Sequence, residues 1–332
     1  MMARARDSQV DLTDRKIFIT GGAGFIGSKL VERVIDRNKV VIYDNFARNA
    51  IESGRAWNHP NLEVIRGDIL DYAHLREAMR GANVIVHLAA IAGIDTVVKS
   101  ITNTMKVNLI GTYHVLEAAR DLLALESLVD FSTSEVFGSY AYKSEENDTT
   151  TLGSVGEGRW TYAVSKLAAE HLGHAYHREQ GLPVVSIRPF NIYGPGQVGE
   201  GALQIFVRRA ISDETITIHG DGDQIRSWCF VDDLIDGVLA CIGNEKAVGH
   251  VFNIGNPRGT ITIYGLAETV VRVTESKSRI EFVPKTYADV ELRIPSIDKA
   301  KEILGYRPKV NLDEGIRRTA EWYRAQGKAG RG

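Results

Sequence analysis

The sequence has very few cysteines, since Cys229 and Cys241 are the only two among its 332 residues. Two cysteines are too few for a disulfide framework or for a zinc site built from cysteine. We expect two ordinary thiols in a reducing cytoplasm and no bound metal. The sequence also lacks any apolar run close to the roughly 20 residues that a membrane-spanning helix needs. Residues Met1 to Val10 are polar and lack the apolar core of a signal peptide, which again predicts a cytoplasmic protein.

An excess of basic charge is absent as well. The 40 lysines and arginines are matched by 42 aspartates and glutamates, which gives a formal net charge of −2. This balance argues against a broad nucleic-acid surface, although a local basic site for a substrate phosphate is compatible with it. The composition, with 44% hydrophobic and 25% charged residues, is ordinary for a globular chain of one large or two modest domains.

What the first half of the chain does contain is a regular alternation of short apolar runs and helical patterns. Strands that alternate with helices form βαβ units, whose parallel sheet is covered by helices on both faces. The pattern predicts an α/β, Rossmann-type doubly wound fold, in which ligands bind at the carboxyl ends of the strands. The expected strands are residues 16–20, 40–43, 62–65, 84–88, 128–132 and 184–188, and the expected helices are 28–36, 73–79, 101–124 and 160–179.

The regular alternation of strand and helix patterns ends after Pro189. The segments become shorter, and a Gly-Pro-Gly sequence at 194–196 marks a loop. We expect residues 15–188 to form the Rossmann domain and residues 189–327 to form mostly a smaller substrate-binding domain. The apolar run 250–254 is a candidate strand that returns to the main sheet.

A glycine-rich turn follows the first expected strand. It reads Gly-Gly-Ala-Gly-Phe-Ile-Gly over residues 21–27 and leads into a helical pattern. A phosphate-binding turn needs glycine where the backbone bends sharply, where it approaches the pyrophosphate, and where helix and strand pack closely. Gly21, Gly24 and Gly27 fit these three positions and predict a dinucleotide site. A plain βα turn is the alternative.

The second expected strand ends at Asp44. A carboxylate at this place can accept hydrogen bonds from both hydroxyls of the adenosine ribose, and it would repel a 2′-phosphate. Asp44 therefore predicts NAD rather than NADP as the cofactor. The alternative is a turn aspartate, because Asp44-Asn45 is also typical of turns. Asp68 and Ile69 follow the third strand, where they would flank the adenine or simply lie in an exposed loop.

Tyr162 and Lys166 are four residues apart in a helical pattern and therefore share one face of the helix. A nearby ammonium charge favours phenolate over phenol, so we expect a lowered pKa for Tyr162. The tyrosine can then take a proton from a sugar hydroxyl while hydride leaves the same carbon for NAD. Upstream, Ser132-Thr133-Ser134-Glu135 places hydroxyls and a carboxylate at the end of an expected strand.

Together these motifs resemble the extended short-chain dehydrogenase/reductase family, and the resemblance runs from about Lys16 to Tyr323. It implies an NAD-dependent enzyme that acts on a nucleotide-linked sugar. The further motifs that carry it are His87-Leu88-Ala89-Ala90, Asn108, Pro189-Phe190-Asn191-Ile192-Tyr193-Gly194-Pro195-Gly196, Gly220-Asp221-Gly222 leading to Arg226, and Leu304-Gly305-Tyr306-Arg307-Pro308.

The resemblance implies that Thr133 hydrogen-bonds the reacting sugar hydroxyl, that Tyr162 is the base and that Lys166 holds the nicotinamide ribose. Glu135 joins them as an expected catalytic residue. The expected substrate-binding residues are Ser134, Arg159, Asn191, Arg226 and Arg293, with Asn191 and the last two arginines on the diphosphate; exposed surface arginines are the alternative. The expected cofactor-binding residues are Gly21, Gly24, Phe25, Ile26, Gly27, Asp44, Asn45, Asp68, Ile69, Leu88, Ala89, Ala90, Asn108, Tyr162 and Lys166.

Two residues favour one reaction within the family, whose members oxidise the sugar at C4 and then epimerise it, remove water or remove carbon dioxide. Ser134-Glu135 resembles the hexuronate decarboxylases, whereas dehydratases have Asp-Glu and 4-epimerases usually have a small hydroxyl residue instead of the glutamate. Arg159 also resembles the UDP-glucuronate decarboxylases, and it could pair with a substrate carboxylate. The alternative roles are loop ordering for Arg159 and capping for Glu135.

The sequence therefore predicts a UDP-glucuronate decarboxylase that forms UDP-xylose or a 4-keto pentose. Asn253-Ile254-Gly255-Asn256-Pro257 also resembles these enzymes, or is only a turn. Two departures weaken the match: Phe137 stands where tyrosine is usual, and residues 148–158 match no subgroup closely. A UDP-sugar or UDP-uronate 4-epimerase, a 4,6-dehydratase, a keto-sugar reductase and a non-catalytic cofactor sensor stay open as alternatives.

The expected partners are a nucleotide-diphosphate sugar, with UDP as the expected nucleotide, and a second copy of the chain. Relatives commonly form dimers by packing two long helices of each subunit into a four-helix bundle. The segments 101–124 and 160–179 are long enough for this, and the small residues Ala163, Ala168 and Ala169 permit close approach. We therefore expect a homodimer.

Overall fold

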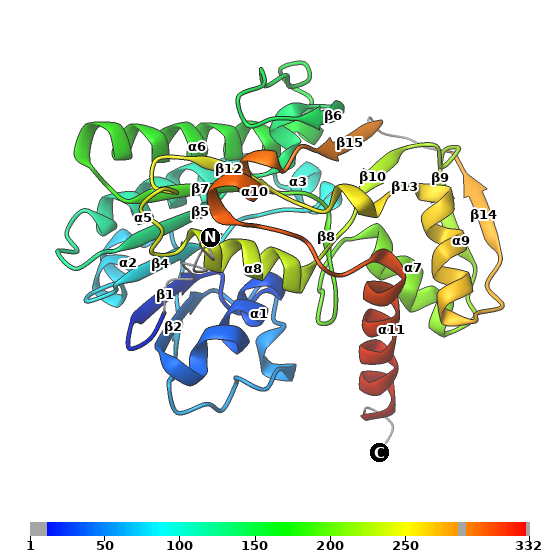
Figure 1. The fold of residues 1–332 in the computed structure, drawn as a ribbon, viewed down its shortest axis with the longest axis horizontal. Coiled ribbons are helices and arrows are strands. Elements are labelled where there is room, and N and C mark those ends of the chain that lie inside the picture. Colours follow the sequence, from blue (N-terminus) through cyan, green and yellow to red (C-terminus); the bar gives the residue numbers. More distant parts are fainter. Residues whose placement is uncertain (1–11, 285–289, 330–332) are drawn as a thin grey trace, which may run out of the picture.

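A seven-stranded parallel sheet forms the centre of the molecule (Figure 1). The computed structural model describes residues 12–284 and 290–329. The strand order is β12-β7-β5-β4-β1-β2-β3, and every neighbouring pair runs parallel, which confirms the predicted doubly wound fold. The strands are β1 (Lys16–Thr20), β2 (Lys39–Asp44), β3 (Leu62–Arg66), β4 (Val84–His87), β5 (Ser127–Phe131), β7 (Val184–Pro189) and β12 (Val251–Ile254).

The inner strands form from short apolar runs because both of their faces are buried in the sheet. Strands β4 and β5 are buried along their whole length. Each of the six strands predicted in the first half begins and ends within one residue of the observed strand. The strand order reverses between β1 and β4, and this switch point is where a doubly wound sheet binds its ligand.

Helices cover both faces of the sheet. α1 (Phe25–Val34) and α8 (Val231–Cys241) pack on one face, whereas α2 (Tyr72–Ala78), α5 (Gly111–Ala119) and α6 (Thr161–Gln180) pack on the other. Figure 1 shows α6 and α8 on opposite sides of the strands. The predicted helix 160–179 is confirmed as α6, which ends where Gly181 adopts a left-handed conformation with φ of 72°.

Residues 101–124 do not form the single helix predicted from the sequence. After α3 (Ile94–Lys99), helix α4 (Ile101–Met105) passes through a π-helical turn, η3 (Lys106–Ile110), into α5, which ends at Ala119. At the wide turn, the buried Asn108 side chain hydrogen-bonds to the N–H and the carbonyl of Ile91, at 2.8 and 3.0 Å. Helical periodicity cannot reveal such a turn, because a contact distant in sequence stabilises it.

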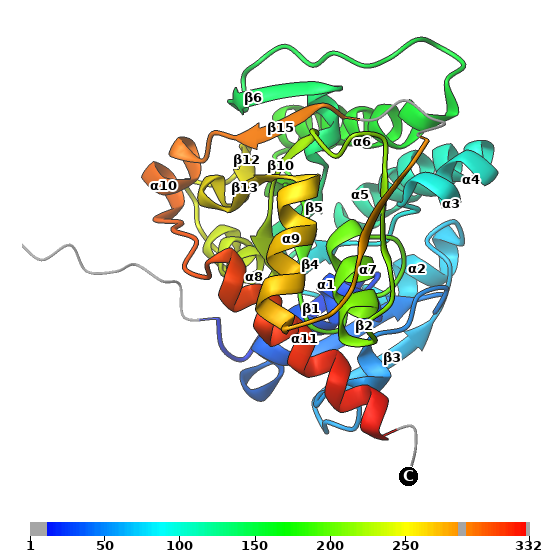
Figure 2. The same ribbon diagram turned by 90° about the vertical axis from the view of Figure 1, so that its right-hand side faces the viewer.

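Smaller sheets and further helices lie beside the central sheet, and Figure 2 shows α7, α9 and α11 packed together. A four-stranded sheet has the order β13-β10-β15-β6, and two pairs, β11-β8 and β14-β9, complete this part. These strands are β6 (Tyr140–Ser144), β8 (Ile192–Tyr193), β9 (Ile216–His219), β10 (Ile225–Ser227), β11 (Cys229–Phe230), β13 (Thr260–Thr262), β14 (Ile280–Val283) and β15 (Leu292–Pro295). The remaining helices are α7 (Ala202–Ile211), α9 (Ile263–Thr274), α10 (Asp298–Leu304), α11 (Leu312–Ala329) and the 3-10 turns η1 (Ile35–Arg37), η2 (Ile51–Ser53), η4 (Ser134–Phe137), η5 (Gly158–Trp160) and η6 (Pro257–Gly259).

Two strands connect the parts of the chain on either side of residue 188. Strand β12, which comes from the second half and lies within the run 250–254, is the edge strand beside β7 in the central sheet. Strand β6 comes from the first half and pairs with β15. The chain therefore crosses the expected boundary in both directions. None of the helices in the described residues is long and apolar enough to cross a membrane.

Candidate active site

The glycine-rich turn connects β1 to α1 and is shaped by close backbone contacts. Gly21 has a φ of 70°, and a Cβ on it would lie 2.6 Å from the backbone nitrogen of Ala89. A Cβ on Gly27 would lie 2.6 Å from the carbonyl oxygen of Gly21, whereas one on Gly24, the N-cap of α1, would meet only that oxygen at 3.3 Å. The turn thus brings bare backbone to the start of a helix, and it fits a dinucleotide pyrophosphate.

Asp44 lies at the carboxyl end of β2 and is buried. Its carboxylate accepts hydrogen bonds from the N–H of Ala23 in the glycine-rich turn, at 3.0 Å, and from the N–H of Phe46, at 2.7 Å. Burial raises the pKa of Asp44, and these hydrogen bonds oppose that rise. The bond to Phe46 is the turn chemistry that the sequence offered as an alternative, and the bond to Ala23 places the carboxylate against the glycine-rich turn.

The other residues expected near the cofactor surround the same switch point. Asn45 is exposed and accepts from the N–H of Ala47 at 3.0 Å. The Asp68 carbonyl accepts from the Tyr43 hydroxyl at 3.0 Å. Three residues, Phe25, Ile26 and Leu88, pack against the larger core; Ile69 is buried, Ala89 is half-buried and Ala90 is exposed.

His87, at the end of β4, takes part in a hydrogen-bond chain whose directions can be assigned. The Thr112 hydroxyl donates to the Asn108 carbonyl at 2.7 Å, so Nε2 of His87 must donate to Thr112 Oγ1 at 2.9 Å. Nδ1 of His87 then accepts from the Thr20 hydroxyl at 2.6 Å, and Thr20 Oγ1 accepts from the N–H of Ala89 at 3.3 Å. Burial lowers the pKa of His87 to about 3, which agrees with a neutral ring.

The expected catalytic side chains meet at the carboxyl end of β5. Thr133 caps η4, where its Oγ1 accepts from the N–H of Glu135 at 3.2 Å. Tyr162 and Lys166 lie in the first two turns of α6, and the Thr133 hydroxyl hydrogen-bonds to the Tyr162 phenol. The Lys166 side chain is buried, and its positive charge acts on His87 and Asp130.

The expectation of a lowered pKa for Tyr162 is wrong when the protein groups around it are considered alone. Burial raises the pKa of Tyr162, and the negative charge of Glu135 raises it further. The largest opposing contributions come from the Thr133 hydroxyl and from Arg293. Periodicity places the lysine on the right helix face but cannot report how deeply the tyrosine is buried.

Glu135 is held by arginines from two distant parts of the chain. Arg159, in η5, donates from Nη1 to Oε2 at 2.7 Å and from Nη2 to Oε1 at 3.4 Å. Arg293, in β15, places Nη1 at 3.6 Å from Oε1. Burial disfavours the charged carboxylate, but the positive charges of Arg293, Arg159 and Arg226 outweigh it and hold the pKa of Glu135 below its usual value. Glu135 therefore serves as an ion-pair partner, and its side chain is not a helix cap.

The arginines expected on the diphosphate are buried, so the alternative of exposed surface arginines is wrong. Arg226 and Arg293 are paired positions on the parallel strands β10 and β15. Arg226 donates to the carbonyls of Ile225, at 3.1 Å, and Val290, and Arg293 donates to the Gly138 carbonyl at 3.1 Å. Their neighbour Asn191, with φ of 42°, donates to the carbonyl of Ser227 at 3.1 Å.

The unusual positions of the sequence have structural explanations. The Phe137 ring lies 4.9 Å from the guanidinium carbon of Arg188 and 6.2 Å from the Phe190 ring, so a phenyl group is well packed there. Asn253 is buried in β12, and its amide donates to the carbonyls of Ser144 and Ser296, at 3.0 and 3.2 Å. Residues 148–158 contain no regular strand or helix before η5.

Asp130 is a site residue that the sequence reasoning did not identify. It is paired in register with His87 of β4 and Ser186 of β7, and Leu128, two residues earlier, faces the core beneath α6. Alternation along the strand therefore turns Asp130 toward the same side. It is 1% exposed, burial raises its pKa, and Lys166 opposes that rise. The available signal was a charged residue within an apolar strand.

No group of three or more histidines, cysteines or acidic residues in the described part of the chain is arranged to hold a metal ion. Both cysteines are buried thiols. The residues around the switch point instead fit a dinucleotide, because the turn leaves bare backbone at Gly24, the N-cap of α1, where a Cβ would meet only the Gly21 carbonyl oxygen.

Known proteins support this assignment. Residues 17–255 match the NAD dependent epimerase/dehydratase family. The chain is similar to the UDP-N-acetyl-alpha-D-glucosaminuronate decarboxylase of Bacillus cytotoxicus, with 34% identity over 324 residues that cover 93% of this chain and 98% of that protein. It is also similar to UDP-glucuronic acid decarboxylase 1 of Arabidopsis thaliana, with 37% identity over 314 residues that cover 93% of this chain and 70% of that protein.

The chain is also similar to solved structures. The UDP-glucuronic acid 4-epimerase from Bacillus cereus, in complex with UDP-glucuronic acid and NAD, has a TM-score of 0.86 and 29% identity, and the match covers 94% of this chain and 99% of that chain. Pal from Bacillus thuringiensis has a TM-score of 0.84 and 34% identity, with 94% of this chain and 99% of that chain covered. The matches confirm the resemblance to extended short-chain dehydrogenases/reductases and NAD as the cofactor. The chain therefore belongs to the NAD dependent epimerase/dehydratase family.

Proposed function

We propose that this protein is a UDP-glucuronate decarboxylase that acts through transient oxidation of the sugar at C4. The observation that carries the proposal is the buried cluster of Glu135 with Arg159 and Arg293 beside Tyr162. Arg226 also acts on Glu135, and guanidinium groups are suited to bind both the diphosphate and the carboxylate of such a substrate. The decarboxylase relatives support the same reaction.

The first step needs a base at the C4 hydroxyl. Tyr162, as phenolate, would take the hydroxyl proton, and the Thr133 hydroxyl would hydrogen-bond the same oxygen. NAD, when bound, accepts the hydride from C4 and later returns it to the ketone. Lys166 is buried in the same helix and would orient the nicotinamide ribose.

Oxidation at C4 turns the uronate into a β-keto acid. The bond between C5 and the carboxylate then breaks, carbon dioxide leaves, and the electron pair forms an enolate whose oxygen is on C4. The Tyr162 phenol and the Thr133 hydroxyl would stabilise that oxygen by hydrogen bonds. The enolate takes up one proton at C5, so each turnover consumes one proton from the solvent.

A dehydratase is less compatible with this site. That reaction needs an acid beside the base to protonate the leaving C6 hydroxyl, and Ser134 stands where dehydratases carry aspartate. Glu135 does not replace it, because its arginine partners lower its pKa and keep it ionised. The 4-epimerase alternative draws its support from solved neighbours such as the Bacillus cereus enzyme.

The test is incubation of the purified protein with UDP-glucuronate, UDP-N-acetylglucosaminuronate and UDP-glucose, followed by mass spectrometry. We expect a uronate to lose the mass of carbon dioxide and UDP-glucose to stay unchanged. Loss of water from UDP-glucose would instead identify a dehydratase. An unchanged mass together with NMR evidence of inversion at C4 would identify an epimerase and overturn the proposal.

We infer that the cofactor lies over the turn at residues 21–27. The N-terminus of α1 would bind the pyrophosphate, and Asp44 would accept hydrogen bonds from the ribose hydroxyls. Asp44 would also make the protein prefer NAD to NADP, because its buried carboxylate leaves no favourable place for a 2′-phosphate. Residues 15–188 would then form the NAD-binding domain, completed by β12, and residues 189–327 would mostly form the substrate-binding domain.

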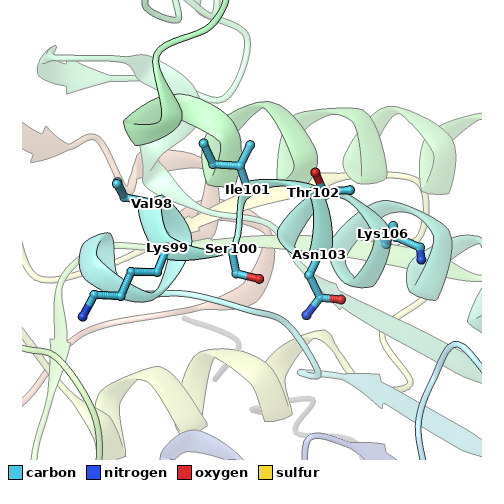
Figure 3. A pocket seen from close by; sticks show the side chains of 7 residues that line it. All are labelled: Val98, Lys99, Ser100, Ile101, Thr102, Asn103 and Lys106. Atoms are coloured by element: carbon cyan, nitrogen blue, oxygen red, sulfur yellow. The ribbon is translucent and has the colours of Figure 1, made fainter.

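We also propose a homodimer formed by the face of α4, α5 and α6. Large apolar side chains are exposed there, and such a patch is typical of an interface. Figure 3 shows the adjoining pocket at the α3–α4 junction, where Ile101 points toward α6 and Lys99 points away. Ala163 and Ala169, suggested by the sequence as contacts, are buried inside the subunit, and Ala168 is half-buried. The exposed apolar residues of this face are Val98, Ile101, Ile110, Tyr113 and Val164.

A further inference from the structure

Glu200 joins the loop before α7 to the loop after β4. Its carboxylate accepts from the N–H of Asp95 at 3.0 Å, from the N–H of Thr96 at 3.2 Å and from the Thr96 hydroxyl at 2.7 Å. The N-cap of α3 is Gly93, which has no side chain of its own for capping, so a residue more than a hundred positions away supplies the cap. Gly93 has a φ of 99°, and a Cβ there would lie 2.8 Å from Cδ of Glu200.

Arg48 makes a second bridge to the same loop. Its Nη2 donates to the carbonyl of Ala92 at 2.7 Å. Gly199, the residue before Glu200, passes directly against this guanidinium, because a Cβ on Gly199 would lie 2.8 Å from Cζ of Arg48. Contacts between side chains and backbone therefore join three segments. These are the loop after β2, the loop after β4 and the loop that leads into α7.

The bridge from Arg48 to Ala92 crosses the carboxyl end of β1. In the sheet, β1 lies between β4 and β2, so a bond between the loops after β2 and β4 spans the position of the glycine-rich turn. The loop that carries Arg48 is also tied to that turn, since the N–H of Ala50 donates to the Ala23 carbonyl at 2.7 Å. On the other side, Gly21 touches the backbone of Ala89.

We propose that Arg48 and Glu200 are positioning residues that form a clasp over the bound dinucleotide and slow its release. The proposal rests on the cofactor site inferred above. A reaction that returns its hydride to the sugar within one turnover gains nothing from cofactor exchange, and early release would leave the sugar oxidised. A clasp built from two side chains of opposite charge, each seated against a glycine, meets this need without closing the sugar site.

The experiment measures the release of NAD from the full-length protein without any sugar. Arg48→Met keeps the aliphatic stem but removes the donor, and Glu200→Ala removes all three accepted hydrogen bonds. Each protein is loaded with NAD, freed of excess and chased with isotope-labelled NAD, and the bound fraction is followed by mass spectrometry. We expect each variant to release NAD about tenfold faster than the wild type or more, equivalent to about 1.4 kcal/mol.

Thr262→Ala is the matched control, because it removes the N-cap of α9, which accepts from the N–H of Gly265 at 3.0 Å, and touches none of the three segments. Wild-type release rates in both clasp variants would overturn the proposal, as would an equal acceleration in the control. If Glu200→Ala does not fold, Glu200→Gln replaces it, with a smaller acceleration expected. Since no sugar is present, failure of the decarboxylase assay leaves this result unaffected.

Discussion

At the residue scale, Asp130 places a carboxylate inside the apolar strand β5, where its negative charge raises the pKa of Tyr162. Asp130→Asn removes that charge with almost no change in volume. We expect the pKa of Tyr162, the proposed base, to fall, so the rising limb of the pH profile of kcat/KM should move to lower pH. The measurement is the initial rate on UDP-glucuronate across pH. A limb that stays in place or moves to higher pH would contradict the assignment.

The control for this change is Ser186→Ala. Ser186 is the register partner of Asp130 on β7 and is equally buried, but it carries no charge. A similar shift in this control would mean that packing around the strand, rather than the charge of Asp130, determines the pH dependence.

Glu135 is the residue on which the choice of reaction depends. Glu135→Gln removes the charge that pairs with Arg159 and Arg293. We expect kcat for decarboxylation to fall by about 100-fold or more, with NAD release unchanged. Glu157→Gln is the matched control on the segment that carries Arg159, since the Glu157 side chain accepts from Trp160 Nε1 at 2.9 Å. A rate close to the wild type in Glu135→Gln would contradict the role.

The positions of single residues in the site were predictable where the spacing of motifs determines them. The Thr-Ser-Glu and Tyr/Lys motifs meet at one strand end because parallel strands share an edge. The electrostatics were not predictable, because the burial of Tyr162 and the approach of Arg293 to Glu135 depend on strands joined only in the folded chain.

At the scale of elements, the π-helical turn at Lys106–Ile110 is the feature to test. Asn108→Ala removes the bonds to Ile91 and the bond to Ser165 Oγ at 3.0 Å, which leaves the half-buried N–H of Ile91 without this acceptor. We expect the free energy of unfolding to fall by about 1–3 kcal/mol, measured by urea denaturation. Asn103→Ala, on an exposed position of α4, should change it by less than about 0.5 kcal/mol. Equal effects in both variants would refute the role of Asn108.

Elements were predicted well where burial determines them and poorly where distant contacts do. The inner parallel strands are mostly apolar, and their bounds agree with the structure to one residue. Strands β6 and β15 gave no such signal, because each is short, contains a charged residue and depends on its partner. The helix predicted over 101–124 is helical only to Ala119 and contains a π-helical turn that the sequence did not reveal, for the same reason.

At the scale of the whole molecule, the exposed apolar face of α4 to α6 leads to a test of assembly. Tyr113→Asp places a charge on this face, where Tyr113 is 44% exposed. We expect light scattering to show a dimer for the wild type and a monomer for the variant, because a buried unpaired charge disfavours association. Tyr142→Asp is the control, since Tyr142 is exposed on strand β6 rather than on these helices. A wild-type monomer at working concentration would remove the homodimer.

The exchange of strands between the two halves also sets the order in which the chain can fold. During synthesis, β7 has no neighbour on its outer edge until residue 254 has been made, and β6 must wait for β15 at residue 295. Such non-local pairings are slow to form, and unpaired edges invite aggregation meanwhile. Arg293 arrives with β15, so the ion pair that completes the site forms only when nearly nine-tenths of the chain has left the ribosome. A nascent chain therefore carries Tyr162 long before it can be an enzyme.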